Sequence, residues 1–173
     1  IIPDRLDGAS CIAQLLTRQI QLTAAEQFYL RALAGYEQAL GPEHTSTLQT
    51  VNNLGALYAA QGKLAQAEQF YLRALAGYEQ ALQLETIPAL KTVRNLGLLC
   101  RDQGQTEKTA KMFQRAVLGC EKVLGPDHPH TLAVVNDLTK LMVVVEGNET
   151  EGQNADNSHN SSRRRGRLKS LLR

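Results

Sequence analysis

Apolar residues recur through most of the chain at the spacing of one helix face. In one stretch they stand at i, i+3, i+6 and i+7, which are Val51, Leu54, Leu57 and Tyr58. A second stripe of this kind occupies Leu64, Ala67, Phe70, Tyr71, Ala74, Leu75 and Tyr78. Between the stripes, residues 60–63 read "AQGK", in which Gly62 can take the left-handed conformation that ends a helix. The pattern predicts an antiparallel helical hairpin.

This hairpin is one copy of a repeat with a period of 42 residues. The stretch "AEQFYLRALAGYEQAL" at residues 25–40 returns unchanged at 67–82, and in altered form from Ala110 as "AKMFQRAVLGCEKVL". The connection "GPEHTSTL" after Leu40 returns as "GPDHPHTL" after Leu124. A single hairpin cannot bury its own apolar stripe, so copies must stack to form a continuous core. The period is typical of a solenoid.

We therefore expect an all-α protein, a right-handed α-solenoid of antiparallel helical hairpins with about 3.5 repeats. The first helix of each hairpin, helix A, is expected near 7–19, 46–60, 88–102 and 130–145. The second, helix B, is expected near 22–40, 64–82 and 106–124. The repeat domain would span residues 1–146, with repeats near 6–41, 46–83 and 88–125 and a final helix near 129–146. Residues 147–173 would form a disordered polar linker and a basic tail.

Three local features support this division. Gly55 and Gly97 recur at one phase of helix A, where a missing side chain would let helices A and B touch. Ser46 and Gln49 have the spacing of a capping box at a helix start. In helix B, the first copy of the apolar stripe would hold successive hairpins together in the same way as the second. Its members are Phe28, Tyr29, Ala32, Leu33 and Tyr36.

The stretch "NLGALYAAQGKLAQAEQFYLRAL" resembles the tetratricopeptide repeat. Leu54, Gly55 and Tyr58 match the Leu-Gly-x-x-Tyr of that family, and Ala67, Tyr71 and Ala74 match its later small and aromatic positions. Val51 departs from the family preference for Trp. The period of 42 rather than 34, with the connection "LGPEHTSTL", is similar to the kinesin-light-chain type of array. Such arrays also occur at the C-termini of multidomain proteins that carry NB-ARC-like NTPase modules.

The resemblance implies a protein-interaction scaffold whose A helices line a concave groove that binds a peptide or partner protein. The non-core face of the A helices carries polar residues at recurring phases, and amides there can grip an extended backbone. The candidate partner-binding residues are Gln49, Asn52, Asn53, Lys91, Arg94, Asn95, Arg101 and Asn136. The basic members would attract an acidic peptide. The alternative is that these residues are ordinary solvated groups or bond within the solenoid.

The sequence offers little chemistry beyond binding. It has no GxGxxG, GxSxG or HExxH motif, and six residues separate Gly55 from Gly62 where a phosphate-binding loop needs four. His128 and His130 flank a connection and lack a third convergent ligand, so no metal site is expected. The recurring glutamates Glu26, Glu68, Glu37 and Glu79 are most simply solvated or helix-pairing charges. We expect neither an enzyme nor a cofactor.

The three cysteines are odd in number and lack CxxC spacing, which indicates a reducing compartment and a cytoplasmic protein. Cys100 and Cys120 replace core aromatic residues and should be buried, whereas Cys11 falls on the groove flank of its helix. No apolar run reaches the length of a membrane span, and no signal peptide is visible.

Charge is unevenly distributed. The last eleven residues, 163–173, hold six Lys or Arg, while residues 1–162 carry a net charge of −4. This tail could solubilise the chain, tether it to nucleic acid or an anionic membrane, or cover the last A helix through its leucines. That helix lacks a B partner and should expose Val135, Leu138, Met142 and Val145.

The chain begins with Ile1 inside a helical pattern, and we expect it to be the C-terminal piece of a longer protein. A second functional hypothesis follows: the array would pack on, or oligomerise, an upstream effector or NTPase module without a separate peptide ligand.

Overall fold

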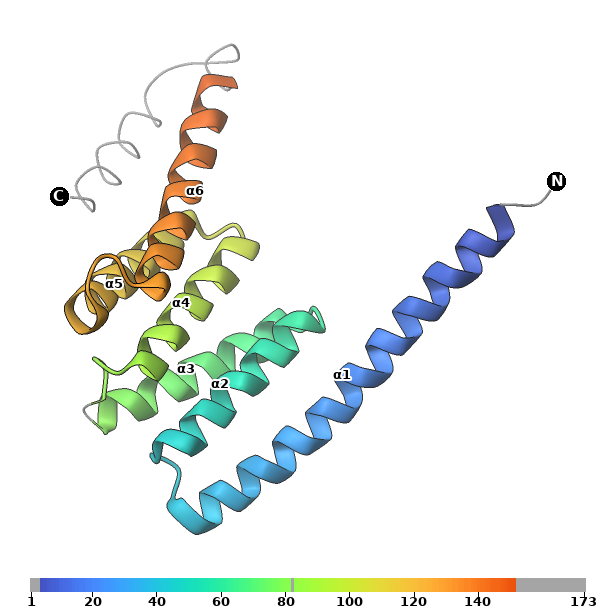
Figure 1. The fold of residues 1–173 in the computed structure, drawn as a ribbon, viewed down its shortest axis with the longest axis horizontal. Coiled ribbons are helices and arrows are strands. Elements are labelled where there is room, and N and C mark those ends of the chain that lie inside the picture. The colour runs from blue at the N-terminus through green and yellow to red at the C-terminus, as the bar shows by residue number, and fades with distance from the viewer. Residues whose placement is uncertain (1–3, 82, 152–173) are drawn as a thin grey trace. The chain divides into compact units, whose positions relative to one another are not determined.

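The computed structural model describes the backbone of residues 4–81 and 83–151 and the side chains of residues 20–81 and 83–145. This part of the chain forms six α-helices and no strand (Figure 1). The helices are α1 (Asp4–Leu40), α2 (Thr45–Ala60), α3 (Leu64–Gln80), α4 (Ile87–Asp102), α5 (Thr106–Leu124) and α6 (Pro129–Glu151). The predicted all-α helical repeat class is confirmed.

The chain divides into two compact units, Ile1–Gly77 and Tyr78–Arg173. Unit 1 contains α1, α2 and most of α3. Unit 2 contains the end of α3 together with α4, α5 and α6.

Helices α2 to α6 lie where the apolar periodicity predicted them. Both hairpin turns reverse at a glycine in the left-handed conformation, with φ of 76° at Gly62 and 72° at Gly104. The turn after α2 is closed by a bond from the Lys63 N–H to the Tyr58 carbonyl, 2.9 Å long. The turn after α4 has the same bond from Gln105 to Cys100 at 2.8 Å. Such bonds satisfy carbonyls that the helix end leaves without partners.

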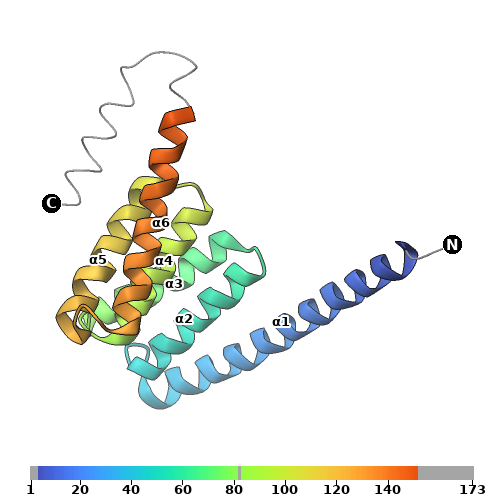
Figure 2. The same cartoon turned by 45° about the horizontal axis from the view of Figure 1, so that its top comes forward.

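The first predicted hairpin is not formed, and the prediction of two helices at 7–19 and 22–40 is wrong. Helix α1 runs without interruption for 37 residues (Figures 1 and 2). The reason lies at the expected turn, where Ile20 occupies the position that Gly62 and Gly104 hold in later repeats. A β-branched residue strongly disfavours positive φ, so the chain continues as a helix.

The loss of this hairpin exposes the first copy of the helix B stripe. Leu33 is buried, but Phe28, Ala32 and Tyr36 are exposed, so the expectation that this copy packs like the second is wrong. The second copy is buried along most of its length in Ala67, Tyr71, Ala74, Leu75 and Tyr78. The same letters pack differently because only the second copy follows an A helix that folds back on it.

Glycines let helices A and B touch in both formed hairpins, as predicted. A Cβ built on Gly55 of α2 would lie 2.7 Å from the Tyr71 ring of α3. In unit 2, a Cβ on Gly97 of α4 would lie 2.7 Å from the Phe113 ring of α5. These distances are shorter than van der Waals contact, so any larger residue would force the helices apart.

The core of unit 2 brings α4, α5 and α6 together. Ala110, Phe113 and Leu141 form a buried cluster, against which Leu98 and Leu138 pack. Cys100 and Cys120 are buried, as predicted. The predicted exposure of α6 is partly wrong, because Leu138 turns toward the cluster and Met142 and Val145 are half-buried. Besides Val135, the exposed apolar residues of α6 are Leu132, Val143 and Val144.

Helix α2 starts at a histidine cap rather than at the predicted capping box. Nδ1 of His44 accepts a hydrogen bond from the Ser46 N–H at 3.2 Å. Before α6, Nδ1 of His128 accepts from the His130 N–H at 3.1 Å. The Ser46–Gln49 prediction is therefore wrong, because the preceding imidazole already serves as the acceptor for the first-turn N–H.

Candidate functional site

The outer faces of α4 and α6 form the polar surface of unit 2 on which most candidate residues fall. Each helix buries one apolar stripe, which includes Val93, Leu96 and Leu99 in α4 and Val134 and Leu141 in α6. On the other face, Lys91, Arg101 and Asn136 are exposed, whereas Arg94 and Asn95 are half-buried. We call this surface, made of Lys91, Arg94, Asn95, Arg101, Asn136, Asp137 and Lys140, the α4–α6 face.

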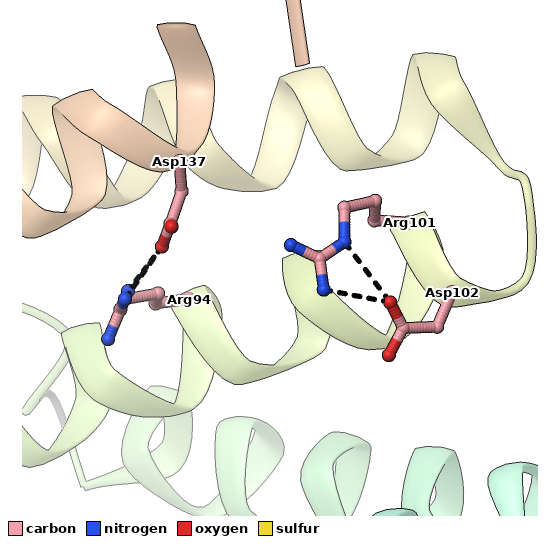
Figure 3. Close-up of polar contacts among 4 residues, drawn as sticks. All are labelled: Arg94, Arg101, Asp102 and Asp137. Atoms are coloured by element: carbon pink, nitrogen blue, oxygen red, sulfur yellow. Dashed lines mark hydrogen bonds and ion pairs between the residues drawn. The ribbon is translucent and has the colours of Figure 1, made fainter. Parts of the chain in front are cut away.

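An ion pair links the two helices at the centre of the α4–α6 face (Figure 3). Oδ2 of Asp137 accepts a hydrogen bond from Nε of Arg94 at 2.7 Å and also lies 2.7 Å from Nη2. The Asp137 side chain is only 11% exposed and that of Arg94 29%, so the pair is largely sheltered from water. The sequence pattern predicted that Arg94 binds a partner, but its guanidinium already pairs with a carboxylate of this chain. The two residues stand 43 positions apart, close to one period.

A second arginine of the face is paired within its own helix. Nε and Nη2 of Arg101 donate to Oδ1 of Asp102 at 3.1 and 2.9 Å (Figure 3). Both side chains are about half exposed, at 47% and 53%. A pair this exposed contributes little to stability and can exchange partners readily.

The positive charge of the α4–α6 face is not fully compensated. Within the side chains that the structure describes, neither Lys91 nor Lys140 forms an ion pair. The positive electrostatic potential of this face acts on His130, at the start of α6. Its pKa is lowered from 6.5, first by burial and then by the positive charges of Lys91, His128 and Arg94. The imidazole therefore stays neutral at pH 7 in a locally cationic surrounding.

Unit 1 carries the remaining candidate residues on α2. Gln49 and Asn53 are exposed, and so are the small residues Ala56 and Ala60 one and two turns further on. Asn52 is half-buried, and both Asn52 and Asn95 take part in interactions within the chain. The sequence alone did not distinguish these two amides from the exposed Asn53.

An acidic clamp that the sequence did not identify as such ties α1 to α2. Oε1 of Glu26 accepts from the Tyr58 hydroxyl and Oε2 from Nε2 of Gln61, both at 2.9 Å. Nζ of Lys63 lies 3.8 Å from Oε2. The bonds from Gln61 and Tyr58 are the main reason that the pKa of Glu26 lies below its usual value. The recurrence of Glu26 as Glu68 was the available signal.

Other recurring glutamates pair successive B helices, which confirms one of the two roles expected for them. In unit 1, Glu37 of α1 pairs with Arg73 of α3. In unit 2, Glu79 pairs with Arg115 of α5 at 3.2 Å. Each pair spans 36 residues, so the contact repeats with the array.

The described residues contain no group of three or more His, Cys, Asp or Glu side chains that could hold a metal ion. The rings of His128 and His130 stack with centroids 5.9 Å apart, and Nδ1 of His128 is used as a helix cap. No described helix is long and apolar enough to cross a membrane. The Cys11 side chain and the 163–173 tail lie outside the described residues, so the predictions made for them stay predictions.

Comparison with known proteins gives two matches to tetratricopeptide repeat families. One covers residues 4–80 and the other residues 90–130, which together exceed half of the chain. No curated protein matched the sequence.

Solved structures share the fold. A putative kinesin light chain of Podosopora anserina with nearly identical TPR-like repeats is 20% identical, with a TM-score of 0.64 over 99% of this chain and 93% of that chain. A variant of the same protein gives 0.64 at 20% identity, over 98% of this chain and 92% of that one. BtubC (BKLC) of P. vanneervenii gives 0.55 at 19% identity, over 86% of this chain and 64% of that one.

Proposed function

Because this chain belongs to the tetratricopeptide repeat family, we propose that it is a protein-interaction module that binds an extended acidic peptide on the α4–α6 face. Repeats of this family generally mediate contacts between proteins. The observation that carries the proposal is the pair of exposed ammonium groups, Lys91 and Lys140, that have no ion-pair partner among the described side chains.

The exposed groups on the face have separate roles in this proposal. Lys91 and Lys140 supply uncompensated charge that attracts carboxylates. Arg101 can turn from the exposed Asp102 to a ligand at little expense, because exposed pairs are weak. Asn136 is exposed and offers both donors and an acceptor to a peptide backbone.

In this proposal, Arg94 holds α4 and α6 in place and does not itself bind the ligand. Its bonds to Asp137 fix α4 against α6, so the lysines and Asn136 stand at a set separation. A preorganised surface loses less side-chain entropy when it binds. In unit 1, the exposed Gln49 and Asn53 of α2 form a second polar surface that can serve the same purpose.

We assign no reaction and no cofactor to the chain, because the family consists of non-catalytic repeat scaffolds. We place it in the cytoplasm, a proposal that rests on the odd number of cysteines and their lack of CxxC spacing.

A second candidate function is structural: the array packs on another module or on a copy of itself. Exposed apolar residues of α1 and α6 favour it. In unit 1 these include Ile20, Phe28 and Tyr36 of α1. In unit 2, Leu132, Val143 and Val144 are exposed on α6.

The proposal is tested by selecting peptides of about 15 residues from a random display library against the chain. A selected peptide is then titrated against two charge-matched variants. Lys91→Ala/Lys140→Ala removes the cations of the α4–α6 face, while Lys108→Ala/Lys111→Ala removes two exposed cations of α5. We expect acidic sequences, and a Kd raised about tenfold or more in the first variant only.

Equal losses in the two variants would show that net charge rather than the α4–α6 face determines binding, and would contradict the proposal. Selection of sequences without acidic residues would contradict it as well. Raising the salt concentration should weaken wild-type binding more than binding by the Lys91→Ala/Lys140→Ala variant.

A further inference from the structure

The C-terminal half of α1 presents a helix B surface that no helix A of its own chain covers. Phe28 is 68% exposed, whereas its copy Phe70 is half-buried and stacks on Tyr58 with centroids 5.2 Å apart. Tyr36 is 41% exposed and its copy Tyr78 is fully buried. Since the residues are identical, the difference lies in what surrounds them.

Gly35 identifies the missing neighbour. A Cβ on Gly77, its copy in α3, would overlap the side chain of Leu48 in α2. A Cβ on Gly119 of α5 would overlap Leu90 of α4 in the same way. At Gly35 a Cβ would meet nothing within 4 Å. Each of these leucines stands 29 positions before its glycine, and position 6, 29 before Gly35, is also a leucine.

The N-terminal half of α1 has the sequence of the missing helix A, but it cannot reach Gly35 of its own chain while α1 is straight. With 3.6 residues per turn, positions 6, 13, 20, 28 and 35 fall within about 80° of one another around the helix. The A-type half and the B-type half therefore form one continuous stripe along α1. At its centre, Ile20 is 69% exposed.

This stripe is symmetric about its midpoint. In the formed hairpins, the helix A glycine opposes an aromatic residue (Gly55 with Tyr71) and the helix B glycine opposes a leucine (Gly77 with Leu48). Carried back by one period, these contacts join position 13 to 29 and position 6 to 35. Both pairs centre on the boundary region of positions 20 and 21. A twofold axis there would place the A-type half of one helix against the B-type half of the other.

We propose that two copies of this chain associate through α1, as an antiparallel helix pair with its twofold axis at positions 20–21. Residues 4–19 of each copy cover residues 22–40 of the other, in the register of the α2–α3 and α4–α5 hairpins. The contact is isologous and closes as a dimer. It is a domain-swapped form of the hairpin that Ile20 prevents within one chain.

The length of α1 agrees with this occupant. Antiparallel helices also bring opposite ends of their dipoles together. A pair of 37-residue helices is about 55 Å long. It would cover the exposed faces of four aromatic side chains, Phe28 and Tyr36 from each copy.

The test is the mass of the 173-residue chain by sedimentation velocity across concentration, with two variants and a control. We expect a dimer for the wild type. Ile20→Gly restores the turn residue of later repeats, so the hairpin closes within one chain and the variant sediments as a monomer. Ala24→Gly introduces the same residue off the turn position and should remain dimeric. Circular dichroism checks that each variant keeps its helices.

Gly35→Ala gives a readout that does not depend on hairpin closure. In an uncovered helix this change only improves helix propensity. In the proposed dimer it overpacks the contact with the partner's residues 4–19 and should raise the dimer Kd about tenfold or more. A wild-type monomer at about 100 μM, far above the Kd of a specific interface, would overturn the proposal. So would a dimer that neither Ile20→Gly nor Gly35→Ala weakens, or one that Ala24→Gly dissociates as completely as Ile20→Gly does.

Discussion

Gly77 lies directly against the side chain of Leu48, so that a Cβ on the glycine would overlap the leucine Cδ2. The contact joins the end of α3 to the start of α2, and unit 2 repeats it between Gly119 and Leu90. A glycine inside a helix costs about 1 kcal/mol relative to alanine. The array keeps this glycine because close approach of the two helices requires it.

The first prediction concerns this contact. Gly77→Ala should lower the free energy of unfolding by about 1–2 kcal/mol, because overpacking by about 1–3 kcal/mol outweighs the gain in helix propensity. Urea unfolding measures the change. In a double-mutant cycle with Leu48→Ala, the alanine at position 77 should become neutral or stabilising, since the opposing methyl groups are gone. Additive effects of the two changes would argue against the contact.

The second prediction concerns the Arg94–Asp137 pair. Asp137→Ala leaves a half-buried guanidinium without its carboxylate and should destabilise unit 2 by about 1–3 kcal/mol. Asp102→Ala removes the exposed carboxylate beside Arg101 and should change stability by no more than about 0.5 kcal/mol. Thermal unfolding of the two single variants makes the comparison. Equal losses of stability in the two variants would show that the burial of Asp137 does not strengthen its ion pair with Arg94.

The third prediction is a pH dependence that arises from Glu26. The pKa of its carboxyl is lowered from 4.5 in the folded chain, chiefly by bonds from Gln61 and Tyr58. The folded state thus binds this proton less readily than the unfolded state does. The stabilisation is present above pH 4.5 and is lost as the pH falls through the lower, folded pKa. Melting temperatures between pH 3 and 7 should fall less steeply for Glu26→Gln than for the wild type. Parallel curves would contradict this role.

The fourth prediction compares two tyrosines. The Tyr78 hydroxyl is buried without a hydrogen-bond partner among the described residues, and burial raises its pKa to about 12. Tyr78→Phe should therefore leave stability unchanged or raise it by up to about 1 kcal/mol. Tyr58→Phe should lower stability by about 1–2 kcal/mol, because it removes a bond to the Glu26 carboxylate. Urea unfolding of the two variants tests the contrast, and a loss of stability in Tyr78→Phe would contradict it.

Sequence predicted the repeating helices because their signals are periodic and local. Val51, Leu54 and Tyr58 mark the buried face, and Gly62 marks the turn. The sequence also contained the reason for the failure at α1, since Ile20 stands where later repeats have glycine. The residues around Ile20 are so similar to those of later repeats that this single difference was missed. It decides whether a hairpin can form.

The candidate site was less predictable because it depends on pairings between side chains. The repeat period places Asn95 and Asp137 at equivalent positions. It does not predict the hydrogen bond that Arg94 of α4 donates to Asp137 of α6. That contact needs the spacing of two helices, which no local pattern encodes. The phase did indicate the polar side of α4, where Lys91 and Arg101 are exposed.

The most direct test of the proposed interaction module is amide chemical-shift mapping with an acidic peptide obtained by selection. We expect the shifts to cluster on α4 and α6, around Lys91, Asn136 and Lys140, and to spare the exposed surface of α5. We also expect the pKa of His130 to rise when the peptide binds, because the added carboxylates offset the cations that lower it. Shifts confined to α5, with the His130 titration unchanged, would contradict the account.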